Sequence, residues 1–85
     1  MEHPISVRSA GGDAGVDFSL NVSGYLQQFR VSLEALEDHF GLPIDHDEEA
    51  QVRAFHDGAQ RICAVAKKKP HVPGNNRVVL VSDDF

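Results

Sequence analysis

Apolar and polar residues alternate along residues 16–22, which predicts a β-strand with one buried face. The apolar positions of this strand are Val16, Phe18, Leu20 and Val22. Ser23 and Gly24 then form a tight turn, and residues 25–31 continue as a second strand whose apolar face is interrupted by Gln27. The two segments therefore predict a β-hairpin that packs one face against the rest of the domain.

A helix with a start signal and a stop signal follows this hairpin. Ser32 suits the N-cap position because its hydroxyl can accept a hydrogen bond from a free amide of the first turn. Gly41 and Pro43 end the helix. Its apolar residues recur at helical spacing: Leu33, Leu36 and Phe40.

A second, longer helix is predicted from about Asp45 to Lys69. Asp45 and Glu48 have the spacing of a capping box at its start, and Pro70 ends it. After a turn at residues 73–76, residues 77–82 form a last strand. The apolar residues of the helix recur at intervals of three and four positions: Val52, Phe55, Ala59, Ile62 and Ala66.

These elements predict a small two-layer α+β domain with an antiparallel sheet and two helices on one face. Their order is ββααβ, and Ile5 to Val7 can add an N-terminal strand at a sheet edge. The 85 residues form one domain, residues 1–85. Within it, residues 1–15 supply no more than that edge strand and a loop.

Three parts of the sequence form a characteristic combination. They are the segment from Val31 to Gly41, the later apolar positions Phe55, Ile62 and Ala66, and the ending Val79-Leu80-Val81-Ser82-Asp83-Asp84-Phe85. Together they resemble the family of short bacterial proteins called domain of unknown function 1488, over residues 16–85. The resemblance implies a small α+β fold. The family has no established activity, so the resemblance transfers no catalytic residue.

Composition and charge indicate a globular protein of the cytoplasm. Hydrophobic residues make up 41% and charged residues 25%, as in an ordinary globular domain. The net charge of −5 weighs against general binding of nucleic acid. Cys63 is the single cysteine, which excludes an intrachain disulfide and favours a reducing compartment. Since the sequence has neither a signal-peptide pattern nor a long apolar run, we expect a cytoplasmic protein that does not enter a membrane.

The candidate catalytic and metal-binding residues are better explained by structural roles. Residues 45–49 combine carboxylates with His46, but Ala50 stands where a calcium loop needs glycine, so these acidic residues are expected to cap a helix. His39 and His56 lack an acid–base partner. Cys63 lies near a helix C-terminus, where the helix dipole disfavours a thiolate. We therefore expect no enzymatic activity, no cofactor and no bound metal.

Lys67, Lys68 and Lys69 form a basic cluster that Arg77 can join across the following turn. Such a cluster can bind phosphate groups, although lysines at a helix end more often complement the helix dipole. No aromatic residue is interleaved with them to stack on bases. A weak anion- or nucleic-acid-binding regulatory protein is therefore the alternative function.

The last strand predicts a surface that contacts another protein. Val78, Val79, Leu80 and Val81 are all apolar, so both faces of this strand are apolar, whereas two helices cover one face. Either alternate pair can face the helices, and the other pair is then covered by the N-terminal segment or by a second copy. Our main prediction is a non-enzymatic interaction or accessory module that self-associates as a homodimer, with Val79 and Val81 as the candidate contact face.

Overall fold

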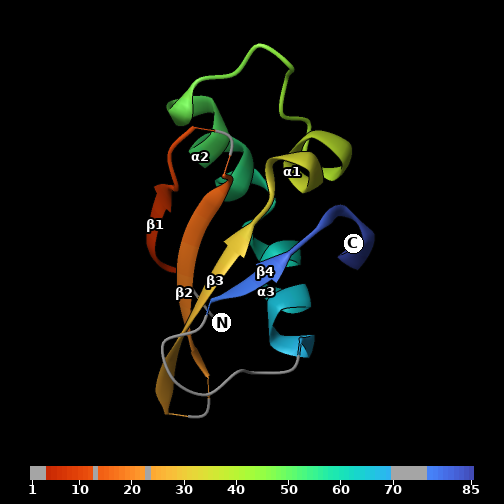
Figure 1. Cartoon of the computed structure of the whole chain (residues 1–85). Coiled ribbons are helices and arrows are strands. Elements are labelled where there is room, and N and C mark those ends of the chain that lie inside the picture. Colours follow the sequence, from red (N-terminus) through yellow and green to blue (C-terminus); the bar gives the residue numbers. More distant parts are fainter. Residues whose placement is uncertain (1–3, 13, 23, 70–76) are drawn as a thin grey trace.

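The structure, a computed structural model, describes residues 4–12, 14–22, 24–69 and 77–85. It has the predicted α+β class, and two helices, α2 (Glu48–Asp57) and α3 (Ala59–Lys68), cover one face of a four-stranded sheet (Figure 1). In chain order the elements are β1 (Ile5–Ser9), β2 (Val16–Val22), β3 (Tyr25–Val31), α1 (Leu33–His39), α2 (Glu48–Asp57), α3 (Ala59–Lys68), β4 (Val78–Leu80) and the 3-10 helix η1 (Ser82–Asp84). Ser23, Pro70 and the predicted turn at residues 73–76 lie outside the described residues.

The sheet is mixed, so the predicted purely antiparallel sheet is wrong at one edge. The strands lie in the order β1-β2-β3-β4, and the first three are antiparallel to their neighbours. β4 pairs with β3 in parallel. The reason is the connection between them, because a crossover through helices on one face returns the chain in the direction of the strand it left. The N-terminal edge strand predicted at Ile5 to Val7 is confirmed as β1.

The first predicted helix is confirmed as α1. The Ser32 side chain accepts a hydrogen bond from the Ala35 amide at 3.1 Å, as expected of an N-cap. Gly41 follows the helix with a φ of +73°, a left-handed conformation that glycine adopts without the steric penalty of a side chain. These contacts are local in sequence.

The second predicted helix is wrong as a single element, because the structure contains two helices separated at Gly58. α2 begins at Glu48 rather than Asp45, and its N-cap is Asp47, whose carboxylate accepts a hydrogen bond from the Ala50 amide at 2.7 Å. The Phe40 ring lies against Gly58 so closely that a Cβ atom there would overlap it. The break in the helix therefore coincides with a tertiary contact to the segment after α1.

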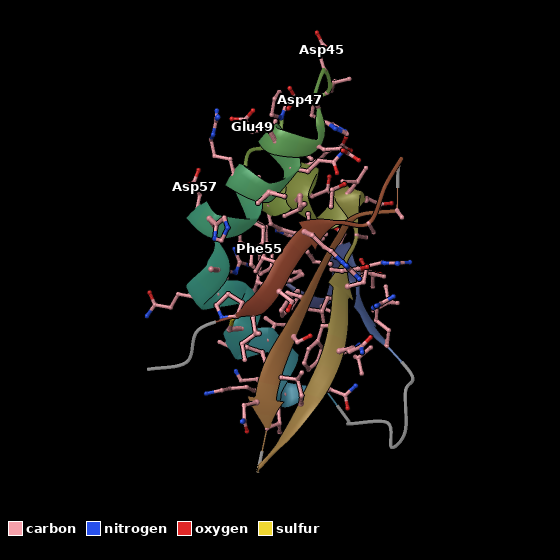
Figure 2. All side chains as sticks on the ribbon, turned by 90° about the vertical axis from the view of Figure 1, so that its left-hand side faces the viewer. Asp45, Asp47, Glu49, Phe55 and Asp57 are labelled. Carbon is pink, nitrogen blue, oxygen red and sulfur yellow. The ribbon has the colours of Figure 1, made fainter. Side chains whose placement is uncertain are left out.

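The hydrophobic core lies between the sheet and the helices. The ring centroid of Phe18 lies 5.3 Å from that of Phe29 and 4.8 Å from that of Phe55. Figure 2 shows Phe55 of α2 between the helices and the sheet. Ile62 and Ala66 of α3 are also fully buried. The predicted apolar seam thus faces the sheet on both sides of the helix break.

The last strand is shorter than predicted, and its orientation is resolved. Val78 and Leu80 are buried, whereas Val79 and Val81 are 47% and 44% exposed. Val79 and Val81 therefore lie on the side of β4 opposite the helices. β1 does not cover them, because it lies at the other edge of the sheet. Among the residues that the structure describes, no helix is long and apolar enough to cross a membrane.

Candidate functional site

The face of the sheet opposite α2 and α3, here called the open face, gathers polar side chains from all four strand regions. Strand alternation places Asp17 and Ser19 of β2 on it, since Phe18 between them points into the core. It likewise places Gln28 and Arg30 of β3 there. No helix among the described residues covers this face (Figure 2).

Asp17 is the centre of a group of ion pairs on the open face. Arg30 lies directly opposite it in the β2–β3 ladder and donates from Nε to Oδ1 at 2.7 Å and from Nη2 to Oδ2 at 3.3 Å. The hydrogen bond to Asp17 and the charge of its carboxylate raise the pKa of Arg30, against the lowering effect of burial. Arg77 brings a second guanidinium, whose Nη1 lies 3.7 Å from Asp17 Oδ2. The Asp17 side chain is left only 11% exposed.

A shallow hollow of about 210 Å³ lies beside this carboxylate. Arg77 spans one side of it and donates from Nη2 to Gln28 Oε1 at 3.0 Å. Arg8 of β1, which pairs with Asp17 across the ladder, lines it as well. The residues that line the hollow are Ser6, Arg8, Asp17, Phe18, Ser19, Leu26, Gln28 and Arg77.

An irregularity in β1 determines where Arg8 lies. The pairing register with β2 shifts between Ile5 and Arg8, and Ser6 within this stretch has a φ of +56°. A β-bulge of this kind re-aims the side chains that follow it. Ser9, the next residue, donates to Gln51 of α2 at 3.1 Å on the helical side, which leaves Arg8 on the open face.

Exposed aliphatic side chains flank the hollow and the ion pairs. Leu26 of β3 lines the hollow and is 54% exposed. Val79 of β4 pairs with Arg30 in the ladder, and Val81 follows just after the strand. Within the candidate contact face, Val79 therefore adjoins Arg30, whereas Val81 lies near Ser32 and Glu34 at the start of α1.

The predicted joining of Arg77 to the lysine cluster is not found, because Lys69 and Arg77 bind different partners. Lys69 binds Asp84 at 3.0 Å, whereas Arg77 binds Gln28 and Asp17 on the open face. Lys67 and Lys68 are exposed at the end of α3, in the helical layer. The cations that gather on one face are instead three arginines.

The acidic run at residues 45–49 surrounds the start of α2. Asp45, Asp47 and Glu49 point outward from the molecule in Figure 2. His46 makes other contacts, with Gln51 at 3.0 Å and with Glu37 at 3.7 Å. Within the described ranges, no group of three histidine, cysteine, aspartate or glutamate side chains is placed to hold a metal ion.

Asp38, His39 and Ser82 meet near the C-terminal segment, but not in the geometry of a catalytic triad. The Ser82 hydroxyl donates directly to Asp38 at 2.6 Å, while His39 Nε2 contacts the Ser82 carbonyl at 3.0 Å and its hydroxyl oxygen at 3.3 Å. A triad requires the imidazole between the hydroxyl and the carboxylate. These contacts hold η1 against α1.

The remaining candidates lie away from the hollow. Cys63 is buried in α3 among core residues. His56 is exposed on α2, with its ring 5.7 Å from that of Phe55. Neither lines the hollow on the open face.

Sequence reasoning missed the arginine group, although part of it was accessible. The antiparallel register that pairs Val22 with Tyr25 also pairs Asp17 with Arg30. The opposite charges at those two positions were a signal of a cross-strand ion pair. Arg8 reaches this region because of the bulge in β1, and Arg77 because the chain returns to form β4 beside β3. Neither feature can be predicted from a local sequence pattern.

The residues from the bulged β1 to β4 match one family model, described as protein of unknown function (DUF1488), over residues 9–80. The chain belongs to this family. Membership in DUF1488 confirms the resemblance expected from the sequence. Neither the curated proteins nor the solved structures include a significant match to the chain.

Proposed function

We propose that this protein is a non-enzymatic interaction module that self-associates through Val79 and Val81 on the open face. The proposal rests on the exposure of the apolar side chains at the end of the chain. Val78 and Leu80 are buried, whereas Val79 and Val81 remain about half exposed. Burying an aliphatic side chain contributes about 1.5–3 kcal/mol. A second copy that covers the same side chains is the simplest way to gain this contribution, since two-fold pairing is the commonest oligomer symmetry.

The non-enzymatic part of the proposal is supported by the contacts of the titratable side chains. Ser82 binds both Asp38 and His39, and His46 binds Gln51. These groups hold segments of the fold together. We further propose that the module works in the bacterial cytoplasm, where its single cysteine, Cys63, would remain a thiol.

Sedimentation equilibrium tests self-association. We expect the wild type to be a dimer in the micromolar range and Val79→Lys to be a folded monomer, because a charged side chain would then have to be buried in the contact. Ile44→Lys is the matched control, since Ile44 is 94% exposed and lies outside the open face. It should leave the dimer intact. A wild type that remains monomeric at several hundred micromolar would refute self-association.

A second candidate function is the binding of an anionic partner by a small regulatory protein. It is favoured by Arg30 and Arg77, which both lie close to Asp17, and by Arg8, which lines the hollow beside that carboxylate. The lysines of α3 offer a separate surface for it. Triple replacement of Lys67, Lys68 and Lys69 by glutamine distinguishes the two surfaces. If those lysines hold a nucleic acid, its salt-sensitive binding should disappear in this variant.

A further inference from the structure

The hollow on the open face lies beside cations that are held by ion pairs and beside Arg8, whose side chain has no partner in the described part of the chain. Arg30 and Arg77 both approach Asp17, and Arg77 also binds Gln28. The Arg8 side chain is exposed, and it makes no ion pair or hydrogen bond with the described residues. Two guanidinium groups therefore lie close to one carboxylate and a third lines the same hollow, in a chain whose net charge is −5. The local excess of positive charge favours an anionic group in this hollow.

The ion pairs also prepare the hollow for binding. Arg77 is held by Gln28 at 3.0 Å and by Asp17 at 3.7 Å, so its guanidinium is oriented before any ligand arrives. An arginine that is already ordered loses less side-chain entropy on binding than a free one. Guanidinium groups bind carboxylates through paired N–H donors, and Arg8 retains such donors.

The surroundings of the hollow match an acidic polypeptide better than a nucleic acid. Phe18 is the one aromatic residue in the lining, and its ring is buried against other core rings, so it offers no surface for base stacking. The exposed apolar side chain in the lining is that of Leu26. An extended peptide can direct acidic side chains to the arginines and an apolar one to Leu26. The acidic net charge of the chain, in contrast, would repel a long run of phosphates.

We propose that the hollow between Arg8 and Arg77 binds a carboxylate of an acidic segment in a partner protein, with Leu26 contacting an apolar side chain of that segment. This inference rests on the proposed interaction function and names the chemistry of its partner. It is independent of self-association, because the hollow is complete within one chain. Arg8 is the residue whose replacement should weaken binding without disturbing the ion pairs of Asp17.

The test is a titration of the full chain, followed by backbone amide NMR. The probe is an acetylated, amidated eight-residue peptide in which glutamate alternates with valine or glycine. We expect saturable shifts at Arg8, Ser19, Leu26 and Gln28. The Arg8→Gln variant should bind about two- to fivefold more weakly, as for the loss of one exposed ion pair. Higher salt should weaken binding to the wild type.

Three controls make the outcome decisive. Arg53→Gln removes an exposed arginine of α2 and should leave the affinity unchanged. A peptide with glutamine in place of glutamate should not saturate. Single-stranded oligothymidylate should bind more weakly than the acidic peptide. Equal binding of the neutral peptide, equal weakening by Arg53→Gln, tighter binding of the oligonucleotide, or no shifts at several millimolar peptide would each overturn the inference.

The same samples separate this inference from self-association. Arg8→Gln should sediment like the wild type, and Val79→Lys should change sedimentation. A monomeric wild type that still binds the peptide at Arg8 refutes self-association and supports the acidic partner. A dimeric wild type that shows no peptide shifts supports self-association and overturns the acidic partner.

Discussion

Asp17 and Arg30 lie directly opposite each other in the β2–β3 ladder and share two hydrogen bonds, of 2.7 Å and 3.3 Å. Their side chains are only 11% and 31% exposed. A bidentate pair with so little exposure is screened less by solvent than an ordinary surface pair. Removing one partner therefore leaves the other charge partly desolvated.

A double-mutant cycle on this pair should reveal a strong coupling. We expect Asp17→Asn and Arg30→Gln to be coupled by about 1–3 kcal/mol in the free energy of unfolding, measured by denaturant titration. The exposed pair of Glu49 and Arg53, at 3.1 Å on α2, is the matched control and should show about 0.3–0.5 kcal/mol. Equal coupling in the two cycles would show that burial of the Asp17 pair has no energetic consequence.

Truncation of Phe55 should cause one of the largest losses of stability in the chain. Its ring is fully buried, 4.8 Å from that of Phe18, and it belongs to the layer of α2 that faces the sheet. We expect Phe55→Ala to lower the free energy of unfolding by about 3–5 kcal/mol. Ile44→Ala should change it by less than about 0.5 kcal/mol, because Ile44 is exposed. A loss of under 1 kcal/mol at Phe55 would contradict the core described here.

The predictions that succeeded depend on neighbours in the sequence. The cap at Ser32, the stop at Gly41 and the alternation of β2 each act within a few residues. The helix break at Gly58 could not be predicted in this way, because its partner Phe40 is distant in sequence and the apolar seam continues across it. The parallel pairing of β4 likewise depends on how the whole helical layer crosses the sheet.

In the candidate site, too, the contacts that could be predicted are those between segments close in sequence. The Asp17–Arg30 pair follows from the β2–β3 register, which the alternation of apolar residues in both strands helps to predict. Arg8 reaches the hollow only because of the register shift after Ile5, and Arg77 only because β4 lies beside β3. Neither the bulge nor the crossover produces a periodic pattern in the sequence. The sequence pattern instead predicted a basic cluster at the lysines of α3.

Replacing Gly58 should have an effect opposite to that usual in a helical region. Alanine commonly stabilises a helix relative to glycine by about 0.5–1 kcal/mol. Here a Cβ atom would overlap the Phe40 ring, so we expect Gly58→Ala to lower the free energy of unfolding by about 1–3 kcal/mol. Thermal and denaturant unfolding would measure the change.

The contact with Phe40 supplies the control for this prediction. In a Phe40→Ala background the overlap is absent, and Gly58→Ala should become neutral or stabilising. A loss of the same size in both backgrounds would mean that the backbone at Gly58, rather than the ring of Phe40, excludes alanine.

Asp84 should make the stability of the C-terminal segment dependent on pH. Its carboxylate accepts hydrogen bonds from the Val81 amide at 2.8 Å and from Lys69 at 3.0 Å. The Val81 amide first, and then Lys69, lower the pKa of Asp84, although burial opposes them. The folded state therefore favours the charged form. Its contribution to stability is fully present above the unfolded pKa of about 4 and is lost as the pH falls through the lower folded value.

We expect Asp84→Asn to reduce the free energy of unfolding by about 1 kcal/mol at pH 7 and to differ less from wild type as the pH falls through the lowered pKa of the folded state, because the wild-type carboxyl is then neutralised. Denaturant titrations at a series of pH values would measure this difference. Asp83→Asn is the control, since Asp83 is an exposed neighbour in the same 3-10 helix, and its difference from wild type should stay small throughout. If the difference for Asp84→Asn instead showed no decrease at acidic pH, the stabilisation would come from the shape of the side chain and not from its charge.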